Sequence, residues 1–296
     1  MRKMQSNINN KLSIFTLMKF IFLATVVFVT LYPFIYMIAV SFSDNMYIIS
    51  HDISFYPKGF NTRMYEIVLR DPRILMSYKN TIIYVVIGTA ISLSTTCMGA
   101  YALSKSKRLL FHKLFTFMIV FTMFFGGGLI PTFLTVYYLG LYNTLWAIVL
   151  PSAISAWNLI LMRSFFQNFP SEIEESGYID GLNDIGVFWR LVLPLSKAAL
   201  STIGLFYAVG MWNSFMDPFI YLKDSSKFPL QVILRDIILA GINFDQEVAG
   251  TSGDAIVIEE PLKFATIIVS VIPIIAVYPF LQKYFVKGIM IGSLKG

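Results

Sequence analysis

The stretch ESGYIDGLNDIGVFWRLVLP, residues Glu175 to Pro194, lies between two long apolar segments. Ser171 can serve as the N-cap of a helix that enters this stretch, and acidic residues in its first turns are favoured by the helix dipole. Gly181 can end that helix in a left-handed conformation. Asn183 can cap a second short helix, and Pro194 can lie in the first turn of the next apolar segment. The pattern therefore predicts a helix, a turn and an amphipathic element that presents Val187, Phe188 and Trp189.

The composition indicates a membrane protein. The chain has 296 residues, of which 56% are hydrophobic and 14% are charged, and its mean hydropathy is +0.69. A soluble domain carries about 25% charged residues. The excess of apolar side chains requires a nonaqueous surrounding, so a polytopic, all-α membrane domain is the first interpretation.

A helix that crosses the hydrocarbon core needs about 20 largely apolar residues. Six segments of the chain meet this requirement: about Leu17–Val40, Thr81–Leu103, Leu114–Leu134, Leu145–Met162, Leu195–Phe215 and Phe264–Leu281. We therefore expect an N-terminal tail over residues 1–16, a six-span membrane domain over 17–284 that includes a loop at 171–194, and a C-terminal tail over 285–296.

The distribution of Lys and Arg predicts the orientation of these spans. If both termini are cytoplasmic, fourteen basic residues fall on the inner side and nine on the outer side. The short loop SKSKRLLFHK, Ser104 to Lys113, gives the clearest local excess. Because basic residues favour the cytoplasmic side, both termini and the 171–194 loop are predicted to be cytoplasmic. The longer segments at about 41–80 and 213–263 are then external, and we expect them to be partly ordered.

Several classes of function lack support in the sequence. The single cysteine, Cys97, lies in an apolar segment, and the chain has only two histidines, so no metal site is expected. Gly126-Gly127-Gly128 lacks the Gly-Lys-Ser/Thr ending of a phosphate loop, and close packing or a helix break near Pro131 is the better interpretation. No catalytic constellation is evident, and the basic residues are explained by topology rather than by nucleic-acid binding.

The spacing within the quoted stretch resembles a known family. The stretch resembles the E-A-A-x(3)-G-x(9)-I-x-L-P loop of the membrane subunits of ABC importers. It has a glutamate followed by two small residues, three residues, Gly181, nine residues and then Leu191-x-Leu193-Pro194. Here Ser176 and Gly177 stand in place of the two alanines. GMWNSFMDPFIYL, at 210–222, and KYFVKGIMIGSLKG, at 283–296, resemble maltose-type carbohydrate importers, most closely the MalG/LplC-type subunits that serve oligosaccharides.

This resemblance implies a type I ABC importer fold, with a cytoplasmic coupling helix between spans four and five. It implies that the coupling loop contacts an ATPase subunit through Glu175, Ser176, Gly177, Asp180, Gly181, Leu193 and Pro194. The expected partners are two ATPase subunits, a homologous second permease, an extracytoplasmic solute-binding protein, membrane lipid and a sugar or oligosaccharide. ATP and Mg are expected on the ATPases, with no cofactor in this chain, which would reside in the cytoplasmic membrane of a prokaryote.

Residues of the translocation path are predicted from the chemistry of sugars, which offer both C–H faces and hydroxyl groups. Aromatic and polar side chains near the span ends suit such a substrate, and the candidates are Asn158, Trp212, Asn213 and Asp217. Helix–helix hydrogen bonding and an interfacial aromatic belt explain the same residues equally well.

Two alternatives stay open at this point. The importer could carry a non-sugar solute, such as a polyamine or a phosphate ester. A secondary transporter that acts without ATPases is a different class, and it predicts charged residues within the membrane. The predicted spans contain almost no Asp, Glu, Lys or Arg at mid-depth, which argues against it.

Overall fold

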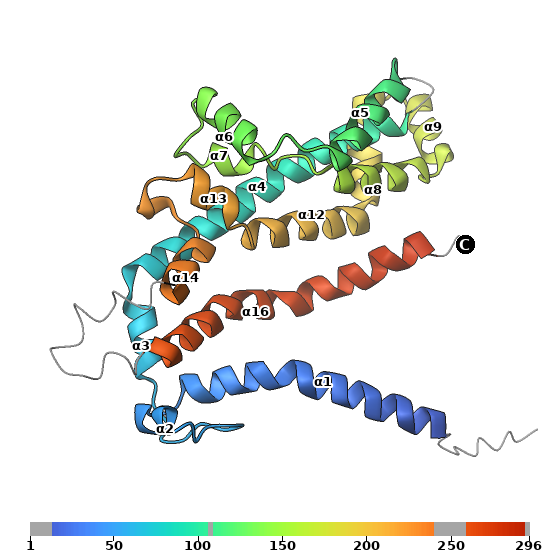
Figure 1. Cartoon of the computed structure of the whole chain (residues 1–296). Coiled ribbons are helices and arrows are strands. Elements are labelled where there is room, and N and C mark those ends of the chain that lie inside the picture. Colours follow the sequence, from blue (N-terminus) through green and yellow to red (C-terminus); the bar gives the residue numbers. More distant parts are fainter. Residues whose placement is uncertain (1–13, 106–108, 240–258, 294–296) are drawn as a thin grey trace, which may run out of the picture. The chain divides into compact units, whose positions relative to one another are not determined.

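The computed structural model describes residues 14–105, 109–239 and 259–293 (Figure 1). Every regular element among these residues is a helix, as the composition predicted. The chain divides into two compact units, which are described separately. Several predicted parts therefore lie partly outside the described residues. They are the N-terminal tail, the basic loop with Lys107 and Arg108, the second external segment at 240–258, and the end of the C-terminal tail.

The first unit consists of three helices and the start of a fourth: α1 (Ile14–Ser41), α2 (Asn45–Ile49), α3 (Arg63–Arg70) and α16 (Glu259–Ser293), whose residues up to Val269 belong here. Its small core forms where Ala39 and Val40 of α1 contact Ile53. The rings of Tyr36 and Phe264 meet edge-on, with centroids 6.1 Å apart, so α16 packs against the end of α1. The rest of α1 is apolar and exposed.

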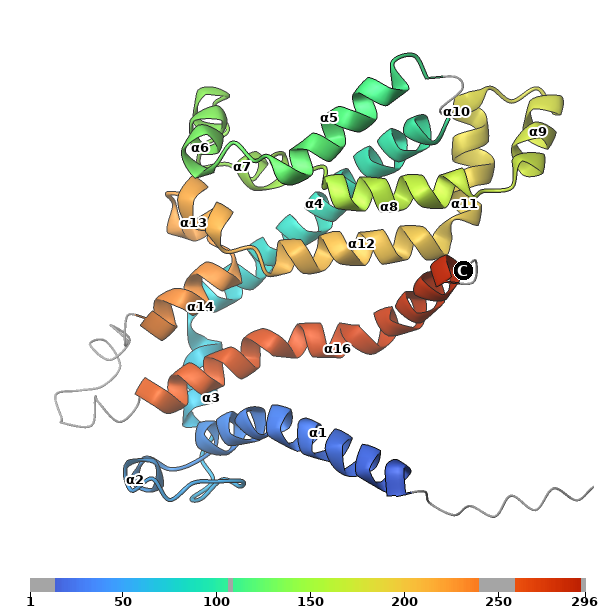
Figure 2. The same cartoon turned by 45° about the vertical axis from the view of Figure 1, so that its right-hand side comes forward.

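The second unit is built around α4 (Pro72–Ser104), which packs along α8 (Ala156–Gln167) and α12 (Lys197–Trp212), as both views show (Figures 1 and 2). Its other elements are α5 (His112–Phe124), α6 (Leu129–Tyr138), α7 (Trp146–Val149), α9 (Ser171–Ile179), α10 (Asp184–Val187), η1 (Phe188–Val192), α11 (Leu193–Leu195), α13 (Met216–Tyr221), η2 (Ser225–Lys227), α14 (Leu230–Leu239) and α16 from Ser270.

The core of the second unit combines aromatic packing with one polar contact. Tyr101 of α4 packs against Phe166 and Phe188, with ring centroids 5.9 and 4.9 Å away. The hydroxyl groups of Thr96 and Tyr207 share a hydrogen bond of 2.6 Å between α4 and α12. Hydroxyl pairs of this kind hold helices together in an apolar surrounding, where burial of side chains alone gives little preference.

Three helices among the described residues are long and apolar enough to cross a membrane: Phe15–Ser41, Pro72–Ser104 and Glu260–Pro279. They contain the first and second predicted spans and all but the last two residues of the sixth. Two further pairs of helices qualify only if each bent pair counts as one span, namely His112–Phe124 with Leu129–Tyr138 and Asp184–Leu195 with Lys197–Trp212.

The third predicted span, Leu114–Leu134, is therefore not one straight helix. Its halves, α5 and α6, are bent by 118° where the three glycines occur. Gly128 has φ +85°, which an L-residue with a side chain rarely adopts, so the backbone can turn sharply there. The predicted helix break is confirmed, and Pro131 lies in the first turn of α6.

The fourth predicted span, Leu145–Met162, is also interrupted. The four residues of α7 are followed by a turn at Pro151, and α8 begins only after Ser155, whose side chain accepts a hydrogen bond from the N–H of Asn158. Pro151 has no N–H to continue a helix. The 12 residues of α8 are about 18 Å long, too short to cross the bilayer core alone.

Candidate functional site

The predicted turn at Gly181 is present in the structure. Gly181 has φ +81° and its N–H donates to the carbonyl of Tyr178 (3.1 Å), while the N–H of Leu182 donates to the carbonyl of Gly177 (2.9 Å). This pair of bonds is the Schellman arrangement that ends a helix. The other end of α9 differs from the prediction: Ser171 is its first residue rather than its cap, and Pro170 precedes it.

A second helical segment follows the turn at once. The side chain of Asn183 accepts a hydrogen bond from the N–H of Gly186 (2.8 Å), as the sequence predicted. The hydroxyl of Tyr178 donates to Oδ1 of Asp184 (2.6 Å) and so joins α9 to α10. Further along, η1 is a short π-helical stretch just before Pro194, which lacks the N–H that a regular helix needs.

The two helical segments approach most closely at Gly177, which is buried. A Cβ at this position would lie 2.6 Å from Cδ1 of Leu191 and 3.1 Å from Cγ2 of Val187. Both distances are shorter than an ordinary carbon–carbon contact, so the absence of a side chain allows α9 to rest on Leu191. Two positions of the recognised spacing, the second small residue and the Leu191 position, thus complement each other in size.

Of the predicted coupling residues, Glu175, Ser176, Asp180, Gly181 and Pro194 are exposed, Gly177 is buried, and Leu193 is partly buried. The first five positions of the predicted set lie together on α9 and its turn, whereas Leu193 and Pro194 form the far end of the second segment.

The coupling loop also exposes three large apolar side chains. Ile179, Ile185 and Trp189 have 85%, 68% and 57% of their surface exposed, whereas Val187 and Phe188 are buried in the core. The sequence analysis missed Ile179 and Ile185. Their signal was available, because they lie two residues before and four residues after the predicted turn at Gly181. We call Ile179, Ile185 and Trp189 the apolar tip.

A charged contact that the sequence did not indicate fixes the inner side of α9. Nζ of Lys105, which follows α4, contacts both carboxylate oxygens of Glu174. Glu174 is buried, in contrast to the exposed neighbours Glu172 and Glu175. The first turns of α9 therefore direct one of their three glutamates toward α4.

The four predicted path residues occupy two places. Trp212 is the last residue of α12, Asn213 follows it, and Asp217 lies in the first turn of α13, so these three are neighbours. Nδ2 of Asn213 donates to the carbonyl of Val209 (3.0 Å) and ends the helix. Asn158 lies apart from them, buried on α8.

Asp217 is half-buried, and burial raises the pKa of its carboxyl group above the usual value. In contrast, hydrogen bonds from the hydroxyl and the N–H of Ser226 lower the pKa of Asp224.

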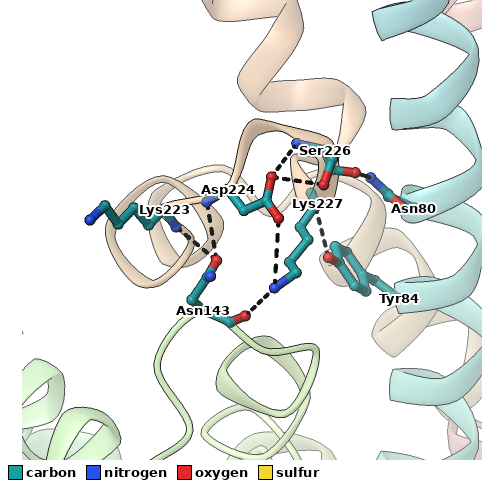
Figure 3. Close-up of polar contacts among 7 residues, drawn as sticks. All are labelled: Asn80, Tyr84, Asn143, Lys223, Asp224, Ser226 and Lys227. Atoms are coloured by element: carbon teal, nitrogen blue, oxygen red, sulfur yellow. Dashed lines mark hydrogen bonds and ion pairs between the residues drawn. The ribbon is translucent and has the colours of Figure 1, made fainter.

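A polar cluster holds the loop between α13 and α14 to the beginning of α4 (Figure 3). Oδ1 of Asn143 accepts the N–H groups of Lys223 and Asp224 (3.1 Å each), and its carbonyl accepts Nζ of Lys227 (2.8 Å). From α4, Tyr84 donates its hydroxyl to the carbonyl of Lys227 (2.7 Å) and Asn80 donates to that of Ser226 (2.8 Å). Asn143 itself has φ +60°, a conformation that Asn tolerates better than most residues. We call this set of residues the outer cluster.

The all-helical fold with long apolar helices and a capped loop is that of a membrane protein, and comparison with known proteins identifies its family. Residues 97–291 match the family described as "Binding-protein-dependent transport system inner membrane component". The chain belongs to this family of multi-pass ABC transporter permeases.

Individual relatives cover nearly the whole chain. The chain is 42% identical to Protein LplC of Bacillus subtilis (strain 168), over 96% of this chain and 95% of that protein. It is 41% identical to the Polygalacturonan/rhamnogalacturonan transport system permease protein YtcP of the same strain, over 96% and 99%. A crystal structure of a bacterial ABC transporter involved in the import of the acidic polysaccharide alginate contains a similar chain, with a TM-score of 0.87, 36% identity and coverage of 93% and 98%.

Proposed function

We propose that this chain is the permease subunit of an ATP-driven importer that moves a sugar or oligosaccharide into the cytoplasm. Membership of the permease family supports the transport role. The relatives named for polygalacturonan and rhamnogalacturonan transport and for alginate import support a carbohydrate as the substrate, rather than a polyamine or a phosphate ester.

The observation that carries the coupling assignment is the apolar tip on a capped helix–turn–helix. Exposed apolar side chains on a loop that is predicted to lie outside the membrane mark a surface that another protein covers. Schellman bonds at Gly181 and the Asn183 cap hold this surface in shape before any partner binds. In our proposal an ATPase subunit binds the apolar tip together with Glu175, Ser176, Asp180 and Gly181.

The rest of the assembly follows from this assignment. Two ATPase subunits bind ATP and Mg, a homologous permease completes the path, and an external solute-binding protein delivers the sugar. The chain crosses the membrane six times with both termini in the cytoplasm, and α5–α6 and α7–α8 supply the third and fourth crossings. Trp212, Asn213, Asp217 and Asn158 contribute to the path. Closure of the ATPases displaces the coupling loop, and the helices rock between inward and outward access.

Purification of the chain from its native membrane, in a detergent that preserves such complexes, tests the proposal. Mass spectrometry should find an ATPase together with a second permease or a solute-binding protein. The carbohydrate retained by that binding protein identifies the substrate. A chain that purifies alone under these conditions refutes the importer assignment.

Substitution of the apolar tip tests the docking surface. Ile179→Asp combined with Ile185→Asp places two charges in the proposed contact, and we expect recovery of the ATPase to fall more than tenfold, as for central interface residues. Met46→Asp is the matched control, because Met46 is 74% exposed on α2, in the predicted external segment. Equal ATPase recovery from the tip variant and the control would exclude the tip as the docking surface.

A further inference from the structure

The contact between Lys105 and Glu174 has the features of a permanent link between helices. Both carboxylate oxygens face the ammonium group, and the two side chains are only 25% and 11% exposed. Charge-assisted bonds of this kind are among the stronger polar contacts, and removal of one partner leaves the other charge poorly solvated. Surface ion pairs, by comparison, hold side chains only loosely.

The surroundings of the pair restrict it further. Nζ of Lys105 lies 5.0 Å from the ring centroid of Tyr101, over its face. Tyr101 in turn packs against Phe188, in the segment that follows the coupling turn. The ammonium group is therefore positioned by α4 on one side and faces α9 on the other.

This link joins α9 to a distant part of the chain. The Tyr178–Asp184 hydrogen bond and the Gly177–Leu191 approach connect α9 to the segment that directly follows it. Lys105 and Glu174 are 69 residues apart, and their contact connects α9 to α4. A displacement of α9 is therefore applied to the end of α4.

The opposite end of α4 is bonded to the outer cluster. Asn80 and Tyr84 donate to carbonyls of the 222–229 loop, and Thr81 accepts the N–H of Leu230 (2.8 Å). The 33 residues of α4 form one continuous helix of about 50 Å. One helix thus carries a charged link to the coupling loop at one end and hydrogen bonds to the outer loop at the other.

We propose that Lys105 and Glu174 are positioning residues for energy coupling. Their ion pair ties the coupling loop to α4, so that α9 and the outer loop move together. This inference rests on the proposed importer function, and it adds a route for the signal through this chain. It assigns Glu174 a role distinct from that of the exposed Glu175, which faces the proposed ATPase.

The test uses the complete complex, reconstituted in liposomes with the solute-binding protein that co-purifies with it. ATP hydrolysis is measured with and without the binding protein on the outside. The ratio of the two rates reports the signal that crosses the membrane, whereas a loss of structure alone lowers both rates together. The variants are Glu174→Gln and Lys105→Met, and the exchanged pair Lys105→Glu with Glu174→Lys. Glu172→Gln is the matched control, because Glu172 is exposed on the same helix.

We expect each single variant to retain its ATPase and its basal hydrolysis, and to lose stimulation by roughly tenfold, within the range usual for coupling between distant sites. The exchanged pair should recover most of the stimulation, and Glu172→Gln should behave as the unmodified chain. Wild-type stimulation in both Glu174→Gln and Lys105→Met overturns this inference but not the importer function. A parallel loss of basal and stimulated rates in these variants does the same. An unmodified chain without an ATPase, or without stimulation, overturns the importer function and this inference with it.

Discussion

Replacement of Gly177 by Ala should weaken the coupling loop, although Ala is the better helix former and stands at this place in the family loop. The new Cβ would lie 2.6 Å from Cδ1 of Leu191 and 3.1 Å from Cγ2 of Val187. Carbon atoms in contact are normally about 3.5–4.0 Å apart, so the methyl group overlaps Leu191 by about 1 Å.

The sign of the effect follows from two opposing contributions. Extra volume in a well-packed site costs about 1–3 kcal/mol. Ala in place of Gly within a helix contributes about 1 kcal/mol in the opposite direction. Leu191 is partly exposed and can shift, which places the steric cost within that range rather than above it. We expect a net loss of about 1 kcal/mol, equivalent to an opening equilibrium about fivefold more favourable.

Hydrogen exchange of the amides in α9 and its turn measures this local opening directly. Gly177→Ala should speed their exchange about fivefold, whereas in a Leu191→Ala background the same substitution should slow it, because the overlapping atom is gone. Gly210→Ala in α12 is the control, since no atom lies within 4 Å of its new methyl group. Slower exchange for Gly177→Ala in the unmodified background would refute the steric reasoning.

Three further predictions concern single positions. Gly181→Val forces a β-branched residue to φ +81° and should destabilise the loop by about 1–2 kcal/mol or more, whereas Gly181→Asn should cost less, as read from the same amide exchange. Asn143→Ala removes the acceptor of the Lys223 and Asp224 N–H groups and should lower thermal stability in detergent by about 1–3 kcal/mol, whereas Asn143→Asp, which keeps an acceptor oxygen at the Oδ1 position, should retain most of that stability. Burial raises the pKa of the Asp217 carboxyl group, so its contribution to stability is complete below the unfolded pKa and is lost as pH rises through the folded pKa. Asp217→Asn should therefore be more stable than the unmodified chain at neutral pH and equally stable in acid. Equal stability of the two chains at both pH values would contradict this assignment.

The local signals in the sequence were sufficient to predict the turn at Gly181. A left-handed Gly181 and an Asn183 cap depend on residues within a few positions of each other, and both are present in the structure. The all-helical class followed from composition for a similar reason, because apolar runs of this length have few other stable forms in a membrane.

The missed features are an interrupted span and a contact between distant segments. The break within Leu114–Leu134 was anticipated from the glycine run and Pro131, whereas the apolar content of Leu145–Met162 predicted a continuous span that Pro151 interrupts. Hydropathy is averaged over a window, so single residues that break a helix, such as Pro151, barely change it. The same residues do change the path of the backbone. The Lys105–Glu174 contact joins residues 69 positions apart, and no local pattern distinguishes Glu174 from Glu172 and Glu175.

The sharp bend between α5 and α6 has a consequence for the chain before it is assembled. Residues 125–128 are not helical, and apolar exposed side chains such as Phe124 and Ile130 lie on either side of them. Hydrocarbon offers no hydrogen-bond partners, so non-helical backbone at membrane depth is stable only where protein covers it or water reaches it. Apart from each glycine and its two chain neighbours, no heavy atom of the described residues lies within 4 Å of the Cβ positions of Gly126 and Gly128. In the proposed six-span topology the bend lies within the membrane, so a solitary copy would draw water or lipid head groups toward it, and the local thinning of the bilayer would disfavour the unassembled state.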